Sequence, residues 1–239
     1  MFIHPRRYYR LLSQRLRTIP FVLRCKRHHV ALQMGDGVFI RNCKVIGKCG
    51  SLSIEDGCRI DSVTFSFGGN DCEITIGKKC SFKDTRLGVH VPPGIIRIHN
   101  NVSLKCASLG VHGAHGVIDI HNNVTINANT NKRTAFCVSA GHTITVLDFC
   151  LLSNSISLST TDFHSIYNDL GERINNDKDI YIGEHVWIGE RSYICKGVSI
   201  ANNNIVGACS VVTKSFEESN VIIAGNPASI KKKRVKWIR

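Results

Sequence analysis

The most regular feature of this chain is a pattern of aliphatic residues that recurs at fixed intervals. Short apolar segments, each with polar residues between its aliphatic positions, begin at spacings of 22, 22, 22, 26 and 36 residues. These segments are LSIEDGCRI from Leu52, ITIGKKCSF from Ile74, IRIHNNVSL from Ile96, IDIHNNVTI from Ile118, ITVLDFCLL from Ile144 and IYIGEHVWI from Ile180. Repetition at a fixed period is typical of a solenoid, in which each unit buries its apolar face against the next.

A shorter period runs through the C-terminal part of the repeats. Aliphatic residues fall there at every sixth position: Ile182, Ile188, Ile194, Ile200, Val206 and Val212. A period of six fits neither a helix nor a simple alternating strand. It fits short strands joined by tight turns, with Asn and Gly where the chain bends. Three such strands make a triangular coil of 18 residues, so a spacing of 22 is one coil plus a short loop.

One long motif carries a resemblance to a known family. The stretch HVWIGERSYICKGVSIANNNIVGACSVVTK, followed by AGNPA, resembles the C-terminal end of the hexapeptide-repeat acyltransferases. Degenerate repeats cover residues 36–215. The resemblance implies an all-β solenoid, a left-handed parallel β-helix, and its handedness rests on the resemblance alone. We expect a helical cap segment over 1–34, the β-helix over 35–215 with a loop insertion at 159–179, and a basic tail over 216–239.

Charge is concentrated at the two ends of the chain, although the net charge is +13. Residues 1–34 carry eight Lys or Arg and residues 231–239 carry six, without an acidic residue in either. The body between them is close to neutral, which argues against a nucleic-acid-binding fold. Basic ends suit an anionic membrane surface, an acidic glycan or a phosphate-bearing cofactor, or they are simply solvated. The first 34 residues have near-helical apolar spacing, and we favour a helix that caps the solenoid over one that lies on a membrane.

Cellular location is indicated only by what the sequence lacks. There is no apolar run long enough for a membrane span and no signal-peptide pattern, so we expect a cytoplasmic protein, with peripheral membrane contact through the basic ends as an option. The eleven cysteines include no CxxC pair. Cys58, Cys80 and Cys150 share one repeat position and are interpreted as reduced core thiols. No set of histidines has the helical spacing of a zinc site, so no metal is expected.

The largest break in the repeat is the polar stretch 159–179, which contains TDFHSIY with His164. A β-helix has a packed core, so its chemistry has to come from loops and grooves on the outside. A histidine near neutral pKa is suited to take a proton from a hydroxyl group. Asp162 or a backbone carbonyl is a candidate to fix its tautomer. By itself, a loop histidine is more often without a catalytic role.

A second resemblance changes that interpretation. The run D-x-H-x-I, GERIN and VWIG resembles the O-acetyltransferases that act on capsular or lipopolysaccharide sugars, including sialic acid polymers. It implies that His164 is the general base and that Trp187, expected to point outward, lies at the active site; subunit packing is the alternative for Trp187. The residues implied for coenzyme A are Ala208 in GACS, where the family commonly has GAGS, Thr213, Lys214 and Lys232, with Lys231 or Lys233 nearly as good a choice.

The two resemblances therefore imply an O-acetyltransferase with acetyl-CoA as co-substrate, acting on a hydroxyl of a bacterial surface carbohydrate by direct attack on the thioester. The resemblance also implies a homotrimer with sites shared between neighbours. His112 and His115, in the loop GVHGAHG, are further candidates for an acceptor groove. The alternatives are another acceptor (an antibiotic, serine or a nucleotide-sugar amine) or a non-catalytic β-helix used for assembly.

Overall fold

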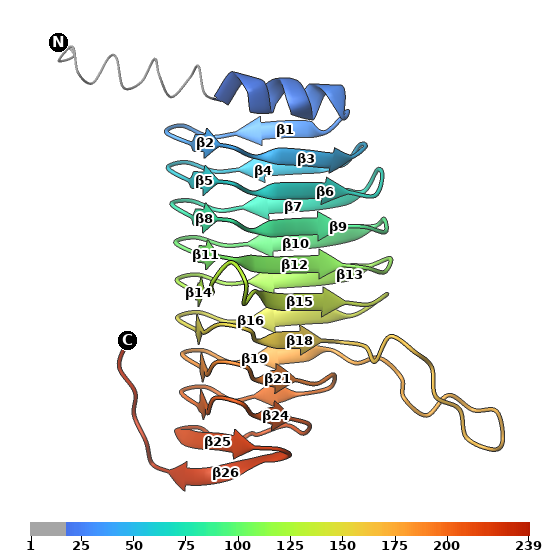
Figure 1. Cartoon of the computed structure of the whole chain (residues 1–239), viewed down its shortest axis with the longest axis vertical. Helices are drawn as coiled ribbons and strands as arrows, with labels where there is room; N and C mark the ends of the chain where they lie inside the picture. Colours follow the sequence, from blue (N-terminus) through green and yellow to red (C-terminus); the bar gives the residue numbers. More distant parts are fainter. Residues whose placement is uncertain (1–17) are drawn as a thin grey trace.

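A computed structural model describes residues 18–239, which form a helix over 18–27 followed by a parallel β-helix (Figure 1). The strands belong to three long sheets that form the three sides of the solenoid. Sheet A contains β1 (Ala31–Met34), β4 (Ser51–Ile54), β7 (Cys72–Ile76), β10 (Gly94–Ile98), β13 (Gly116–Ile120), β16 (Thr143–Val146), β19 (Ile180–Ile182) and β22 (Ser199–Ile200).

Sheet B contains β2 (Phe39–Arg41), β5 (Arg59–Asp61), β8 (Ser81–Lys83), β11 (Ser103–Lys105), β14 (Thr125–Asn127), β17 (Leu151–Leu152), β20 (Trp187–Ile188), β23 (Ile205–Val206), β25 (Val221–Gly225) and β26 (Ala228–Lys233). Sheet C contains β3 (Lys44–Gly47), β6 (Thr64–Phe67), β9 (Arg86–Val89), β12 (Ala107–Val111), β15 (Thr134–Val138), β18 (Ser157–Ser159), β21 (Tyr193–Ile194) and β24 (Val211–Val212). We call the turns between the sheets the A–B, B–C and C–A corners.

The strand register confirms the six-residue period. Ile182 pairs with Ile200, and Ile188 pairs with Val206 one coil further on, both in parallel strands. The aliphatic side chains at these positions are fully buried. One residue per short strand therefore fills a common core, as the spacing predicts.

The corners explain why asparagine recurs in the repeats. Asn101, Asn123 and Asn203 occupy the A–B corner of different coils and have φ values of 57°, 60° and 61°. This left-handed region is unfavourable for most residues, but asparagine tolerates it better than others. The HNN and ANNN stretches thus mark the bends of the coil.

The N-terminal end of the solenoid is covered by the helix over 18–27. Phe21 and Cys25 of the helix over 18–27 are buried, and the Phe21 ring centroid lies 5.7 Å from that of Phe65, so this helix caps the first coils. Residues 1–17 of the expected helical segment lie outside the described residues, and its last four residues form β1 instead of helix. No helix in the described range 18–239 is long and apolar enough to cross a membrane.

The solenoid extends past the expected range of 35–215 in both directions. It begins with β1 at Ala31, and at the other end β25 pairs parallel to β23 and antiparallel to β26. Val221 and Ile223 of β25 are fully buried. Much of the expected basic tail is therefore a hairpin of sheet B, and only the residues after Lys233 leave it.

Candidate active site

A long loop, residues 160–179, leaves the solenoid at the C–A corner between β18 and β19, and we call it the arm (Figure 1). Its two halves run antiparallel, with a bridge between Tyr167 and Arg173. The Ile174 N–H donates to the Ile166 carbonyl at 2.9 Å. At its tip the Asn168 side chain accepts hydrogen bonds from the backbone N–H groups of Leu170 and Glu172. The arm is therefore an ordered hairpin-like projection.

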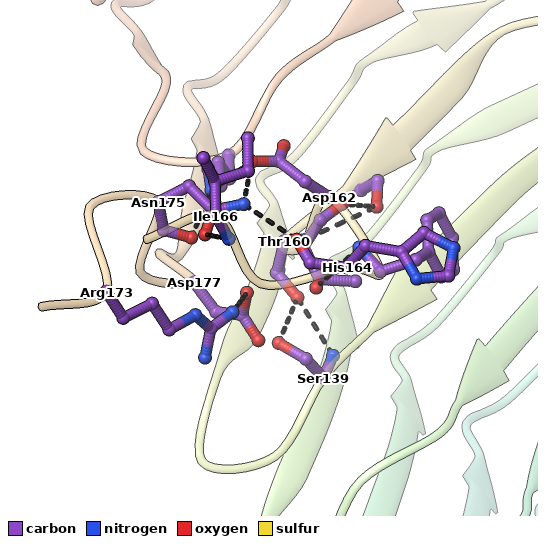
Figure 2. A network of polar contacts seen from close by, with 12 residues as sticks. Ser139, Thr160, Asp162, His164, Ile166, Arg173, Asn175 and Asp177 are labelled. Atoms are coloured by element: carbon purple, nitrogen blue, oxygen red, sulfur yellow. Dashed lines mark hydrogen bonds and ion pairs between the residues drawn. The ribbon is translucent and has the colours of Figure 1, made fainter. Parts of the chain in front are cut away.

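A polar network holds the base of the arm (Figure 2). The Asn175 amide donates to Asp162 Oδ2 at 2.9 Å and to the His164 carbonyl at 2.8 Å, and its Oδ1 accepts from the Ile166 N–H at 2.7 Å. Lys196, from the next coil, forms an ion pair with Asp162 and donates to the Asn175 carbonyl. The hydrogen bond from Lys196 is the main cause that holds the pKa of Asp162 below its usual range.

His164 is held by its backbone, whereas its imidazole is exposed. Its N–H donates to the Asp162 carbonyl at 2.8 Å, and its own carbonyl accepts from Asn175. Figure 2 shows the ring pointing away from Asn175 and Arg173. Within residues 18–239 no hydrogen bond joins the imidazole to the Asp162 carboxylate, which contacts Lys196 and Asn175 instead. Asp162 thus fixes the arm, and the prediction that it orients the His164 ring finds no support in these contacts.

Two of the residues expected to bind coenzyme A lie at the same C–A corner as the arm. Lys196 lies in the turn after β21, while Thr213 and Lys214 follow β24 at the same corner. Ser215 ties these turns together: its hydroxyl accepts from the Ser199 N–H at 2.9 Å and donates to the Gly197 carbonyl at 3.3 Å. Successive coils rise by about 4.8 Å, so the arm, Lys196 and the Thr213–Lys214 turn form one continuous column.

The remaining expected residues lie elsewhere on the chain. Trp187 begins β20 on sheet B, and its side chain is 37% exposed, so it points outward as predicted. Ala208 is exposed in the B–C corner, where its backbone N lies so close to Gly189 that a Cβ there would come within 2.6 Å. Lys232 is exposed on β26. In a coil with three sides, sheet B faces away from the C–A corner, so one chain does not bring Trp187 and His164 together.

Trp237 is a residue near Trp187 that the sequence analysis did not single out. Its ring stacks on His185 with centroids 4.0 Å apart and planes at 5°, and its centroid lies 6.1 Å from that of Trp187. Its indole N–H donates to the His185 carbonyl at 3.0 Å. The end of the chain thus folds back along sheet B beside Trp187. Asn175 and Lys196 were also missed as site residues; Asn175 ends the GERIN stretch, which was the available signal.

The histidine candidate His112 and the cysteines lie outside the arm. His112 stacks on His90 with centroids 4.8 Å apart at the C–A corner, and burial, followed by the charge of His90, lowers the pKa of His112. All eleven cysteines lie within the described residues and are free thiols. Burial raises the pKa of Cys150 to about 12, so this thiol stays protonated and unreactive.

Comparisons with known proteins agree with the fold. Residues 179–214 match the bacterial transferase hexapeptide family (six repeats). The galactoside O-acetyltransferase of Escherichia coli K12 is 37% identical over 92 residues, 37% of this chain and 43% of that protein. The polysialic acid O-acetyltransferase of Neisseria meningitidis is 34% identical over 91 residues, 38% of this chain and 42% of that protein. These matches span less than half the length of either relative.

Two solved structures resemble almost the whole chain. The polysialic acid O-acetyltransferase OatWY matches with a TM-score of 0.61 and 27% identity, over 89% of this chain and 92% of that chain. The polysialic-acid-specific acetyltransferase NeuO matches with a TM-score of 0.55 and 25% identity, over 88% and 89% of the two chains. The predicted fold class, a left-handed parallel β-helix, is therefore confirmed. Residues 179–214 carry the hexapeptide repeats of that family, and the predicted resemblance of the chain to the O-acetyltransferases of polysaccharides is confirmed as well.

Proposed function

We propose that this protein is an O-acetyltransferase that uses acetyl-CoA to acetylate a hydroxyl group of a bacterial surface carbohydrate. The observation that carries the proposal is the arm: it displays an exposed histidine in a D-x-H motif on a β-helix similar to that of OatWY. The relatives named above act on galactosides and polysialic acid, which favours a carbohydrate acceptor. Antibiotic, serine or nucleotide-sugar acceptors, and a non-catalytic assembly role, are the alternatives to be tested.

In the proposed reaction His164 acts as the general base. Its imidazole is exposed and makes no hydrogen bond to another residue of the described chain, so it is free to accept a proton from an incoming hydroxyl. The hydroxyl oxygen attacks the thioester carbonyl, and the C–S bond then breaks. The proton held by His164 passes to the departing thiolate, which leaves as free coenzyme A. The indole N–H of Trp187 or a backbone N–H would stabilise the oxyanion.

The separation of His164 and Trp187 favours a site shared between two copies of the chain. The arm exposes five large apolar side chains: Phe163, Ile166, Tyr167, Leu170 and Ile174. A soluble protein rarely leaves such a group uncovered, and a neighbouring copy is a suitable cover. We propose a homotrimer with three equivalent sites, in which the arm of one subunit meets sheet B of the next.

The residues assigned to the donor fit a long phosphorylated co-substrate. Thr213 and Lys214 are exposed on the same corner as the arm, so a pantetheine chain bound there would run toward His164. Ala208, on another corner, would come from the neighbouring subunit. Lys233 already pairs with Glu218 at 2.7 Å, whereas Lys231 and Lys232 form no ion pair within residues 18–239. Lys231 and Lys232 are therefore the better candidates to meet the nucleotide phosphates.

The proposal is tested by mixing purified protein and acetyl-CoA with capsular and lipopolysaccharide glycans, and by measuring free thiol and acetylated product by mass. His164→Ala should lower turnover by about 10²- to 10⁴-fold, the contribution of a general base. His29→Asn, which changes another exposed histidine at the opposite end of the solenoid, should retain full activity. Full activity of His164→Ala would refute the base assignment. Failure of every acyl-CoA to bind the wild type would favour the assembly role.

A further inference from the structure

Two stacked histidines and a carboxylate form a compact cluster at the A–B corner, away from the arm. His99 follows β10 and His121 follows β13, and their ring centroids are 4.7 Å apart with planes at 27°. Asp119, on β13, faces the Nε2 edges of both rings, with Oδ1 3.0 Å from His99 Nε2 and Oδ2 3.9 Å from His121 Nε2. One ligand atom from each of the three residues lies within 4.8 Å of the others.

The cluster is built into the register of the solenoid. Ile98 pairs with Ile120, so His99 and His121 occupy the same position in consecutive coils, 22 residues apart. The three side chains are only 34%, 31% and 19% exposed, in the order His99, His121 and Asp119. Hydrogen-bonded strands therefore hold the donor atoms close together without a flexible loop.

A second carboxylate lies on the far side of one ring. Asp148 Oδ1 is 3.8 Å from His121 Nδ1 and also accepts hydrogen bonds from the Asn122 backbone N–H at 2.8 Å and side chain at 3.2 Å. A carboxylate beside the outer nitrogen of a metal-binding histidine fixes its tautomer and raises its basicity. Asp148 can play this part for His121, which leaves Nε2 free to face Asp119.

We infer that His99, Asp119 and His121 form a binding site for a divalent transition-metal ion of the zinc type. Two imidazole nitrogens and a carboxylate oxygen are ligands that Zn²⁺ prefers, and water would complete a tetrahedral shell. The three donor atoms, which lie within 4.8 Å of one another, would have to move closer to hold an ion at the usual Zn–N distance of about 2.0–2.1 Å. The ion would link two adjacent coils. The site is independent of the proposed acetyl transfer. A search of the sequence for histidines at helical spacing does not find it, because its residues come together only when consecutive coils stack.

Arg97 competes for the same carboxylate. Its guanidinium NH1 lies 3.3 Å from Asp119 Oδ2, so an arriving metal ion has to share or displace this ion pair. Because the positive charge of Arg97 opposes a second cation, Arg97→Gln should tighten metal binding.

The chain also contains a matched control. His90 and His112 stack in nearly the same way, with centroids 4.8 Å apart and planes at 23°. Within residues 18–239 neither ring lies within ion-pair distance of a carboxylate. A pair of stacked histidines without a carboxylate should bind metal weakly, so replacing this second pair should barely change the metal affinity of the chain.

The experiment uses the full chain after treatment with a chelator, titrated with Zn²⁺ against a chromophoric competitor and with Co²⁺ by absorption. Every protein carries Cys209→Ser, which removes the exposed thiol. We expect about one ion per chain, with affinity lowered more than about tenfold by His99→Gln or His121→Gln and about tenfold by Asp148→Asn. The double variant His90→Gln/His112→Gln should bind within about twofold of the parent, and Arg97→Gln should bind several-fold more tightly.

Thermal melting with and without Zn²⁺ gives a second measure. Bound metal raises the melting temperature of a protein that binds it only when folded, so Zn²⁺ should stabilise the parent and the 90/112 variant but not His99→Gln/His121→Gln. Melting of each metal-free variant shows whether it folds. The inference is overturned if the folded parent binds no Zn²⁺ or Co²⁺ at millimolar concentration, or if the His99→Gln/His121→Gln variant binds as tightly as the parent.

Discussion

The solenoid and the arm differ in how their apolar side chains are exposed to solvent. In the solenoid, Ile182, Ile188 and Ile194 are fully buried and packed against the coils above and below. In the arm, Leu170 and Ile174 are 82% and 62% exposed, and polar contacts at its base hold it in place. The comparison indicates that stability resides in the stacked coils, whereas the proposed chemistry and subunit contacts reside in a projection that the coils do not need in order to fold.

The sharpest test of this division compares one isoleucine from each region. Ile188→Ala leaves a cavity in the core and should lower the free energy of unfolding by about 2–5 kcal/mol. Ile174→Ala removes an exposed side chain, and in the isolated subunit it should change that free energy by less than about 0.5 kcal/mol. Urea unfolding measured at low protein concentration checks both values. Equal losses would mean that the arm is part of the folding core.

The base of the arm should matter for activity more than for stability. Lys196→Met removes the cation that pairs with Asp162, and we expect kcat/KM for the glycan to fall about tenfold because the arm is no longer held in one position. Lys178→Met changes an exposed arm lysine that forms no ion pair in the described chain, and it should retain activity. An unaltered rate for Lys196→Met, with the rate of Lys178→Met reduced, would contradict the role given to this contact.

The lysines at the end of the solenoid should affect the binding of acetyl-CoA and not that of the glycan. Lys231→Gln/Lys232→Gln should raise the KM for acetyl-CoA several-fold, because two cations available to phosphate are lost, and should leave kcat unchanged. Lys233→Gln, whose lysine already pairs with Glu218, is the matched control. These point changes are sharper than deletion of 231–239, which would also remove Trp237 and its contact with His185. A higher KM for the control alone would reverse the assignment.

The smallest expected effect concerns pH. Lys196 lowers the pKa of Asp162, so the stabilising contact is complete above the ordinary carboxyl value of 3.8 and is lost only as the pH falls through the lower value in the folded protein. The ratio of wild-type to Lys196→Met activity should therefore stay constant between about pH 5 and pH 8. A ratio that falls toward pH 5 would show that Asp162 takes up a proton in the working range.

The repeats were predictable because each one is set by residues that are close together in the sequence. Ile182, Ile188 and Ile194 follow each other at six-residue intervals, and an outward Trp187 follows from a buried Val186 beside it. The Asp162–Lys196 contact was not predictable, because it joins two loops 34 residues apart and no period relates them. The hairpin of β25 and β26 was missed for a related reason: the six-residue pattern ends before it, although Val221 and Ile223 continue the core.

The most direct measurement of the proposed shared site mixes two inactive variants. His164→Ala and Trp187→Ala subunits are unfolded together, refolded in equal amounts and assayed for acetyl transfer. If the base of one subunit works with the tryptophan of its neighbour, about one quarter of the sites in randomly mixed trimers have both residues intact, and about a quarter of the wild-type activity should return. If the mixture forms trimers and stays as inactive as each variant alone, the two residues do not act together across a subunit boundary, and the proposed site is wrong.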